Sequence, residues 1–195
     1  DNGPCNMLLD ALAERASGGA LAYDKDGALS AAGQVLPDVL AALLDDEYLQ
    51  RRPPKSTGRE RYGRAYSDAL WSRFAGRRPE DLLRTAVELC ARAIADSLRG
   101  CAVDSAQRSE APFVDEVLLS GGGAHNRTLR ERIAALVAPA TVRALEDGVG
   151  IDVDNKEAVA FAVLAAAALH GRPASVPTVT GARGPAVLGK LCLPP

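Results

Sequence analysis

This chain of 195 residues has few aromatic residues, almost no excess of one charge and only short apolar runs. Aromatic residues make up 4% and the net charge is −2, which excludes a strongly basic nucleic-acid-binding protein. The hydrophobic share of 47% excludes a disordered tail. The longest apolar run, 158–169, is shorter than the ~20 residues of a membrane span, so we expect a buried helix there and no membrane anchor. No signal peptide is visible, and the one methionine is Met7.

Metal-ligand spacings are lacking too. The cysteines form no C-x-x-C pair, and neither His125 nor His170 has a partner at metal-ligand spacing, so we expect no protein metal site. We interpret the cysteines as buried thiols of a protein from a reducing compartment. They are Cys5, Cys90, Cys101 and Cys192.

Abundant alanine and apolar residues at helical spacing predict a mostly helical chain. The first helix follows Asn6, which could cap it, and one that opens at Pro79 stops at Gly100. Further helices are predicted over 35–44, 126–138 and 156–170, and short buried strands over 114–119 and 141–145. The alternation of strands and helices implies a parallel pair, too small to form a sheet that stands alone. We therefore expect neighbouring strands to be missing from this chain.

One segment, 51–64, is basic, with six positive residues against one negative. Pro53, Pro54 and Gly58 predict that most of it is non-helical. It could contact phosphates or carboxylates, or it could be a solvated loop.

A run of three glycines, Gly121, Gly122 and Gly123, follows the first predicted strand and precedes a helix. Glycines let a ligand approach the backbone, and a helix N-terminus favours phosphates. The segment matches neither the G-x-G-x-x-G nor the Walker pattern, so a tight turn without a ligand is an equal alternative. We expect His125 to be a loop residue rather than an acid or base.

Two acidic residues stand where they could carry chemistry. Asp1 lies in the turn D-N-G-P-C-N and could act as a general base, although aspartate is also common in turns for conformational reasons. Glu157 lies in the first turn of the alanine-rich helix, where it could simply complement the helix dipole.

Six ordered segments together resemble the second half of the anhydro-N-acetylmuramic acid kinase family. They are D-N-G-P-C-N-M-L-L-D, Y-D-K-D-G, P-P-K-S-T-G-R-E, L-L-S-G-G-G-A-H-N, G-I-D-V-D-N-K-E-A-V-A-F-A and T-G-A-R. The resemblance covers essentially the whole chain. It implies an α/β fold, helix-rich and containing a short parallel strand pair, as part of an actin-like (ribonuclease H-like) ATPase lobe. The N-terminal lobe would be missing, with 1–112 the mainly helical part and 113–195 the nucleotide-side part.

The resemblance also implies a cytoplasmic enzyme of peptidoglycan recycling and amino sugar metabolism. Such kinases use ATP and Mg to open 1,6-anhydro-N-acetylmuramic acid with water and phosphorylate O6, giving N-acetylmuramic acid 6-phosphate. Asp1 matches the family's catalytic base, and Glu157 its glutamate near the sugar or the attacking water. Gly121, Gly122, Gly123 and Asn126 fall on the nucleotide side, and Asn6 and Lys55 on the substrate side. The resemblance implies a homodimer, and it implies binding neither to nucleic acid nor to a membrane.

Two departures from the family pattern bear on activity. Asn2 replaces a threonine and Cys5 a glycine; if that glycine has a positive φ, the cysteine would be strained at a cost of roughly 1 kcal/mol or more. The family's G-T-S phosphate loop and N-I-G-G block are absent from this sequence. The alternative is therefore a truncated, inactive fragment that at most binds nucleotide or a partner, and we expect little activity from the isolated chain.

Overall fold

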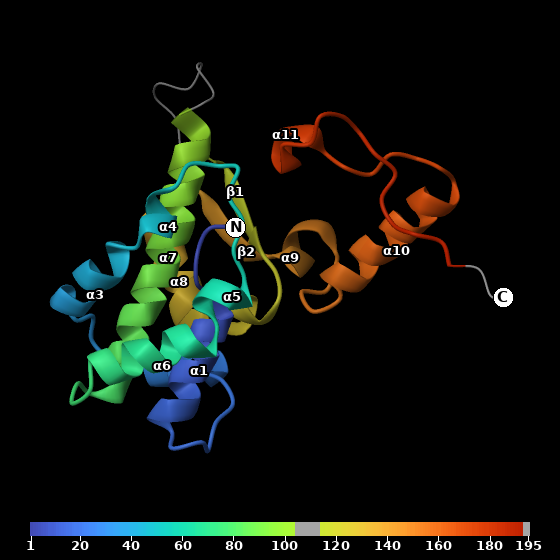
Figure 1. The fold of residues 1–195 in the computed structure, drawn as a ribbon. Helices are drawn as coiled ribbons and strands as arrows, with labels where there is room; N and C mark the ends of the chain where they lie inside the picture. The colour runs from blue at the N-terminus through green and yellow to red at the C-terminus, as the bar shows by residue number, and fades with distance from the viewer. Residues whose placement is uncertain (104–113, 193–195) are drawn as a thin grey trace.

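The protein is helix-rich with one small sheet, as seen in a computed structural model that describes residues 1–103 and 114–192 (Figure 1). The N-terminal part holds α1 (Asn6–Ala16), η1 (Lys25–Gly27), α2 (Ala28–Ala31), α3 (Pro37–Leu44), α4 (Glu47–Gln50), α5 (Arg59–Tyr62), α6 (Arg64–Arg73) and α7 (Pro79–Val103). The remainder holds β1 (Glu116–Leu119), η2 (Gly122–His125), α8 (Arg127–Val137), β2 (Thr141–Ala144), α9 (Leu145–Val149), α10 (Lys156–Leu169) and α11 (Pro177–Thr180). The helix-rich α/β character predicted from the sequence is confirmed. Within the described residues, no helix is long and apolar enough to cross a membrane.

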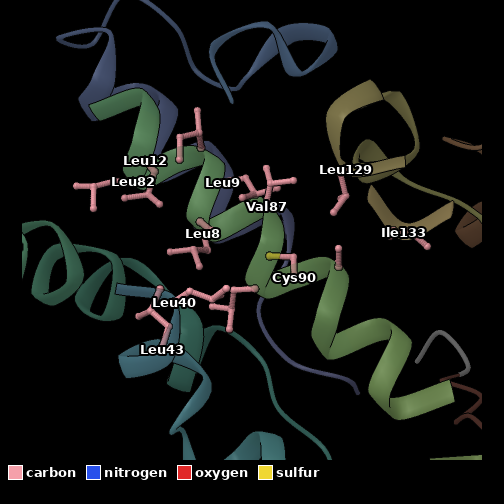
Figure 2. Packing of buried hydrophobic residues seen from close by; sticks show 14 of the residues in the cluster. Leu8, Leu9, Leu12, Leu40, Leu43, Leu82, Val87, Cys90, Leu129 and Ile133 are labelled. Atoms are coloured by element: carbon pink, nitrogen blue, oxygen red, sulfur yellow. The ribbon is translucent and has the colours of Figure 1, made fainter. Parts of the chain in front are cut away.

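Helix α7 is the centre of the hydrophobic core. Its apolar stripe is buried along most of its length, and α1, α3 and α8 pack against it. Figure 2 shows these side chains converging from separate helices, with Leu8 and Leu9 of α1 and Leu129 of α8 around Val87. Each fully buried leucine contributes about 2 kcal/mol through the hydrophobic effect, so this cluster orients the helices that carry the site.

The two strands form a parallel pair, as predicted, with Glu116 opposite Thr141 and Leu119 opposite Ala144. Strand β1 leads directly into the glycine run, so the pair positions that loop at its carboxyl edge. Helix α8 connects the two strands and packs on α7, which fixes the glycine loop against the helical body.

Two local predictions are wrong. Helix α7 runs through Gly100 to Val103, because a glycine costs a helix only about 1 kcal/mol. Cys5, not Asn6, precedes α1, and no side chain caps this helix. The prediction that most of the basic segment is non-helical is confirmed: no helix covers 51–58, and α5 and α6 follow, separated at Gly63, where a Cβ would come within 2.2 Å of a backbone oxygen.

Helix α10 also differs from expectation. It was predicted to be buried, yet none of its residues is, and Phe161 is 68% exposed. Figure 1 shows α10 and α11 set to one side of the helical body, beyond α9. No element within the described residues covers the apolar surface of α10, so the prediction of a buried helix, made from composition, was wrong.

Candidate functional site

The Asp1 carboxylate is held by the basic loop. Its Oδ2 atom accepts hydrogen bonds from the Ser56 hydroxyl and from the Thr57 backbone N–H, both at 2.9 Å. The Asp1 carbonyl accepts a further bond of 2.8 Å from the Tyr48 hydroxyl. The carboxylate group is thus oriented through Oδ2, while Oδ1 accepts no hydrogen bond from the part of the chain that the structure describes.

Lys55 anchors this loop. Its Nζ donates to the carbonyls of Tyr48 and Leu49, at 3.1 and 3.3 Å, and lies 4.7 Å from the centre of the Tyr48 ring. Burial lowers the pKa of Lys55. The ammonium group therefore stabilises the loop that holds Asp1, and the structure accounts for Lys55 without a substrate.

A second anchor is Asp46, which caps α4 by accepting a 2.9 Å bond from the Tyr48 N–H. The same carboxylate accepts bonds from the Arg61 guanidinium and from the Tyr62 hydroxyl at 2.8 Å. Burial opposes the charge of Asp46, but these three donors outweigh it and lower its pKa. Edge-to-face contacts join the rings of Tyr48, Tyr62 and Tyr66, and this packing supports the residues that hold Asp1.

The glycine run meets the start of α1. A Cβ added at Gly122 would lie 2.4 Å from Nδ2 of Asn6, and one at Gly123 would lie 3.1 Å from Oδ1 of Asn6. Gly121 has a φ of +71° and donates its N–H to the carbonyl of Val153 at 2.9 Å. The backbone conformation therefore favours glycine at Gly121, and a side chain at Gly122 or Gly123 would displace the amide of Asn6, whatever ligand the loop binds.

Asn126 caps α8, which begins at the next residue. Its side-chain oxygen accepts a 3.0 Å hydrogen bond from the Leu129 N–H. Close by, Thr128 donates its hydroxyl to the Gly27 carbonyl at 2.8 Å. A Cβ at Gly27 would collide with both Asn126 and Thr128, so this glycine allows η1 to sit against the start of α8.

These segments enclose a cavity of about 500 Å³, open to solvent. The glycine loop, the start of α1 and the η1 segment form its walls, with Asn6, Lys25, Gly122 and Asn126 among the lining residues. Asp10 also lines it, and burial together with the nearby Asp24 raises the pKa of Asp10. The wall also carries Asp24 and Asp26, so three carboxylates face one lysine and the start of α8, and an anionic ligand held there would need a cation beside it.

The second predicted acid, Glu157, lies apart from Asp1. It stands in the first turn of α10, three residues after Asp154, whose carboxylate lies 3.3 Å from Nε2 of His125. Figure 1 shows α10 to one side of the helical body that contains the chain's N-terminus. The described residues therefore do not bring Glu157 and Asp1 into one site.

Comparison with known proteins identifies the family. The family model described as anhydro-N-acetylmuramic acid kinase matches residues 1–194. The chain belongs to the anhydro-N-acetylmuramic acid kinase family. Similar proteins bearing that name come from Pseudomonas paraeruginosa (45% identical over 98% of this chain), Salinibacter ruber (41% over 100%) and Caldanaerobacter subterraneus subsp. tengcongensis (38% over 99%).

The chain spans about half the length of these relatives: 49%, 47% and 48%, respectively. Within that half, segments that carry the resemblance to the anhydro-N-acetylmuramic acid kinase family meet in pairs. The segment that begins at Asp1 meets the Ser56–Thr57 loop, and the glycine run meets both Asn6 and the Y-D-K-D-G turn.

The sequence predictions missed the residues that hold Asp1 in place. Ser56 and Thr57 belong to the segment P-P-K-S-T-G-R-E, from which only Lys55 was selected. Their hydroxyl and backbone donors are suited to a carboxylate, and that pairing was the available signal. The strain predicted for Cys5 is absent, because its φ is −149° rather than positive.

Proposed function

We propose that this chain is the later part of an ATP-dependent kinase that opens 1,6-anhydro-N-acetylmuramic acid with water and phosphorylates O6. The product is N-acetylmuramic acid 6-phosphate, an intermediate of peptidoglycan recycling and amino sugar metabolism. Membership in the family supports this proposal, and the carboxylate of Asp1, oriented by Ser56 and Thr57, is the observation that carries it.

Asp1 would act as the general base. Its carboxylate takes a proton from water as the water oxygen attacks the anomeric carbon of the sugar. The bond from that carbon to O6 breaks, O6 takes the γ-phosphoryl group of ATP, and ADP leaves. Two hydrogen bonds on Oδ2 leave Oδ1 to accept the proton, so the geometry of Asp1 suits a positioned base. Glu157 would lie at the sugar or at the attacking water.

The nucleotide would bind at the cavity below the glycine run. Gly121, Gly122 and Gly123 offer backbone without side chains, and the cavity lies at the start of α8, where free N–H groups attract phosphate. Asn126 would contribute to nucleotide binding by capping α8, whose N-terminus faces the cavity. Asn6 lies against the glycines, so its substrate-side role would place it between the nucleotide and the sugar.

Magnesium would enter with the nucleotide. Among the residues that the structure describes, no group of three or more side chains could hold a metal ion. Magnesium commonly keeps several water ligands and binds through phosphates and one or two carboxylates, and Asp10 lines the cavity. The ion would supply charge neutralisation on the phosphates.

The fold of the complete enzyme would be actin-like, and this chain would provide its C-terminal lobe. The helical part, 1–112, would hold Asp1, and the remainder, 113–195, the nucleotide side. The exposed apolar surface of α10 supports this, since the relatives are twice as long and their remaining half would offer a surface to cover it. We further propose a cytoplasmic homodimer.

A fused protein tests the proposal. The chain would be joined to the preceding half of the Pseudomonas paraeruginosa relative, which is 45% identical over the shared part. We expect the fusion to form N-acetylmuramic acid 6-phosphate from the anhydro sugar and ATP, detected by mass spectrometry. Asp1→Asn should abolish the product while leaving ATP binding intact. Unchanged turnover by the Asp1→Asn fusion would exclude Asp1 as the base.

The alternative is a catalytically inactive fragment that binds nucleotide. It is favoured by the length of the chain, which spans about half of its relatives. Assay of the isolated chain separates the two proposals, because turnover without a second half would eliminate the inactive fragment.

A further inference from the structure

Two cysteines from distant parts of the sequence meet in the core. Cys5 directly precedes α1, where its carbonyl accepts hydrogen bonds from the N–H groups of Leu8 and Leu9 at 2.9 and 3.2 Å. Cys90 lies on α7, against which α1 packs, and Figure 2 shows it beside Leu8. Cys5 packs against the core cluster that contains Cys90, and a Cβ at Gly3, two residues before Cys5, would lie 3.4 Å from Cβ of Ala93, one turn after Cys90 on α7. Both backbone segments belong to the packed core, so this contact is a fixed feature of the fold.

The two thiols differ in environment. Cys5 is half-buried, so small molecules can reach it from solvent, whereas Cys90 has no exposed surface. The neighbouring Cys90 thiol lowers the pKa of Cys5, against the opposing effects of burial and of Asp10. The difference in exposure decides the order of reaction, because a dissolved hydroperoxide can reach the sulfur of Cys5 but not that of Cys90.

We propose that Cys5 and Cys90 are a redox-active pair that hydroperoxides convert into an internal disulfide. The Cys5 sulfur attacks the O–O bond of the hydroperoxide, which yields a Cys5 sulfenic acid and one molecule of water or alcohol. The Cys90 sulfur then displaces the sulfenic oxygen, which leaves as a second water with the proton of the Cys90 thiol. Two thiols are oxidised and one peroxide bond is reduced, so no further reactant is needed.

This modification site does not depend on the proposed kinase activity. It has a structural consequence for that activity, because Cys5 lies in the same short segment as Asp1. A bond to α7 would tie this segment covalently to the core.

Peptide mapping tests the proposal on the full 195-residue chain. The reduced protein is treated with a small excess of hydrogen peroxide, its remaining thiols are alkylated, and it is digested with trypsin. We expect a cross-link between the peptides 1–15 and 85–92 that dithiothreitol removes. Its yield should exceed that of any other cysteine pair by about tenfold or more, because the native fold holds these sulfurs together.

Matched controls identify the cause. Cys5→Ser and Cys90→Ser should each abolish the cross-link, and Cys192→Ser, at an exposed cysteine, should leave it unchanged. Repeating the oxidation of the wild-type chain in urea should remove the preference for this pair, a test that needs no variant to fold. Equal yields of several cysteine pairs under native conditions would overturn the proposal. So would accumulation of a Cys5 sulfinic acid beside a reduced Cys90.

Discussion

Replacing Glu88 by alanine should substantially destabilise the protein, because this carboxylate joins α7 to α8 inside the core. Glu88 is 3% exposed and accepts hydrogen bonds from Arg92 at 2.6 Å and from Nη2 of Arg132 at 2.8 Å. A second bond, from Nε of Arg132, makes that pair bidentate. Burial opposes the charge, but the two guanidinium groups outweigh it and lower the pKa of Glu88.

The size of the effect follows from the exposure of the partners. Removing one member of a buried ion pair costs about 3–5 kcal/mol when the other is left without water. Here the side chains of Arg132 and Arg92 are 30% and 42% exposed, so both can regain hydration. We therefore expect Glu88→Ala to lower the free energy of unfolding by about 2–3 kcal/mol, which is less than a fully buried pair would lose.

Urea unfolding followed by far-UV circular dichroism measures this loss. Glu131→Ala is the matched control, since its pair with Arg127 lies on the surface of α8 and both side chains are well exposed. That variant should change the unfolding free energy by less than about 0.5 kcal/mol. If Glu88→Ala were no more destabilising than Glu131→Ala, the reasoning that the buried carboxylate joins the two helices would be refuted.

Three further predictions follow from the same structure. Gly27→Ala should destabilise the chain by about 1–3 kcal/mol in urea, because its φ is +74° and its Cβ would lie 2.8 Å from the backbone nitrogen of Thr128; Gly184→Ala, whose Cβ would meet nothing within 4 Å, should not. Because the folded state lowers the pKa of Glu88 below its ordinary value of 4.5, its stabilisation is complete above that pH and lost as pH falls through the folded pKa. Acid titration of the unfolding free energy should show this loss, and Glu88→Gln should reduce it. Phe161→Ser should change stability by less than about 0.5 kcal/mol in urea, since this side chain is 68% exposed; a larger loss would show that α10 is packed.

Sequence patterns predicted the helices and strands that residues close together in the chain determine. The apolar spacing of α1 and the Pro79 start of α7 predicted those helices, and the strand–helix alternation predicted the parallel pair. The helix predicted to begin at Asn126 is α8, which starts one residue later, with the Asn126 side chain as its cap. Gly100 failed as a stop signal because a single glycine costs a helix only about 1 kcal/mol.

The contacts around the candidate site could not be predicted in the same way. The hydrogen bonds from Ser56 and Thr57 to Asp1 join residues more than fifty positions apart, and no periodicity reports such a contact. The collision between Asn6 and an added Cβ at Gly122 is likewise visible only once the fold is known. Composition predicted that α10 would be buried, but burial depends on a covering surface that the described residues do not supply.

The two acids proposed for catalysis stand on unequal structural support. The contacts that orient Asp1 come from Tyr48, Ser56 and Thr57, all within the described residues. Glu157 depends on the position of α10, a helix with no buried residue, so these residues do not fix its distance from Asp1. A variant that disturbs the loop around Asp1 therefore reports on the site even in this chain, whereas a change at Glu157 becomes informative only in a protein that covers α10.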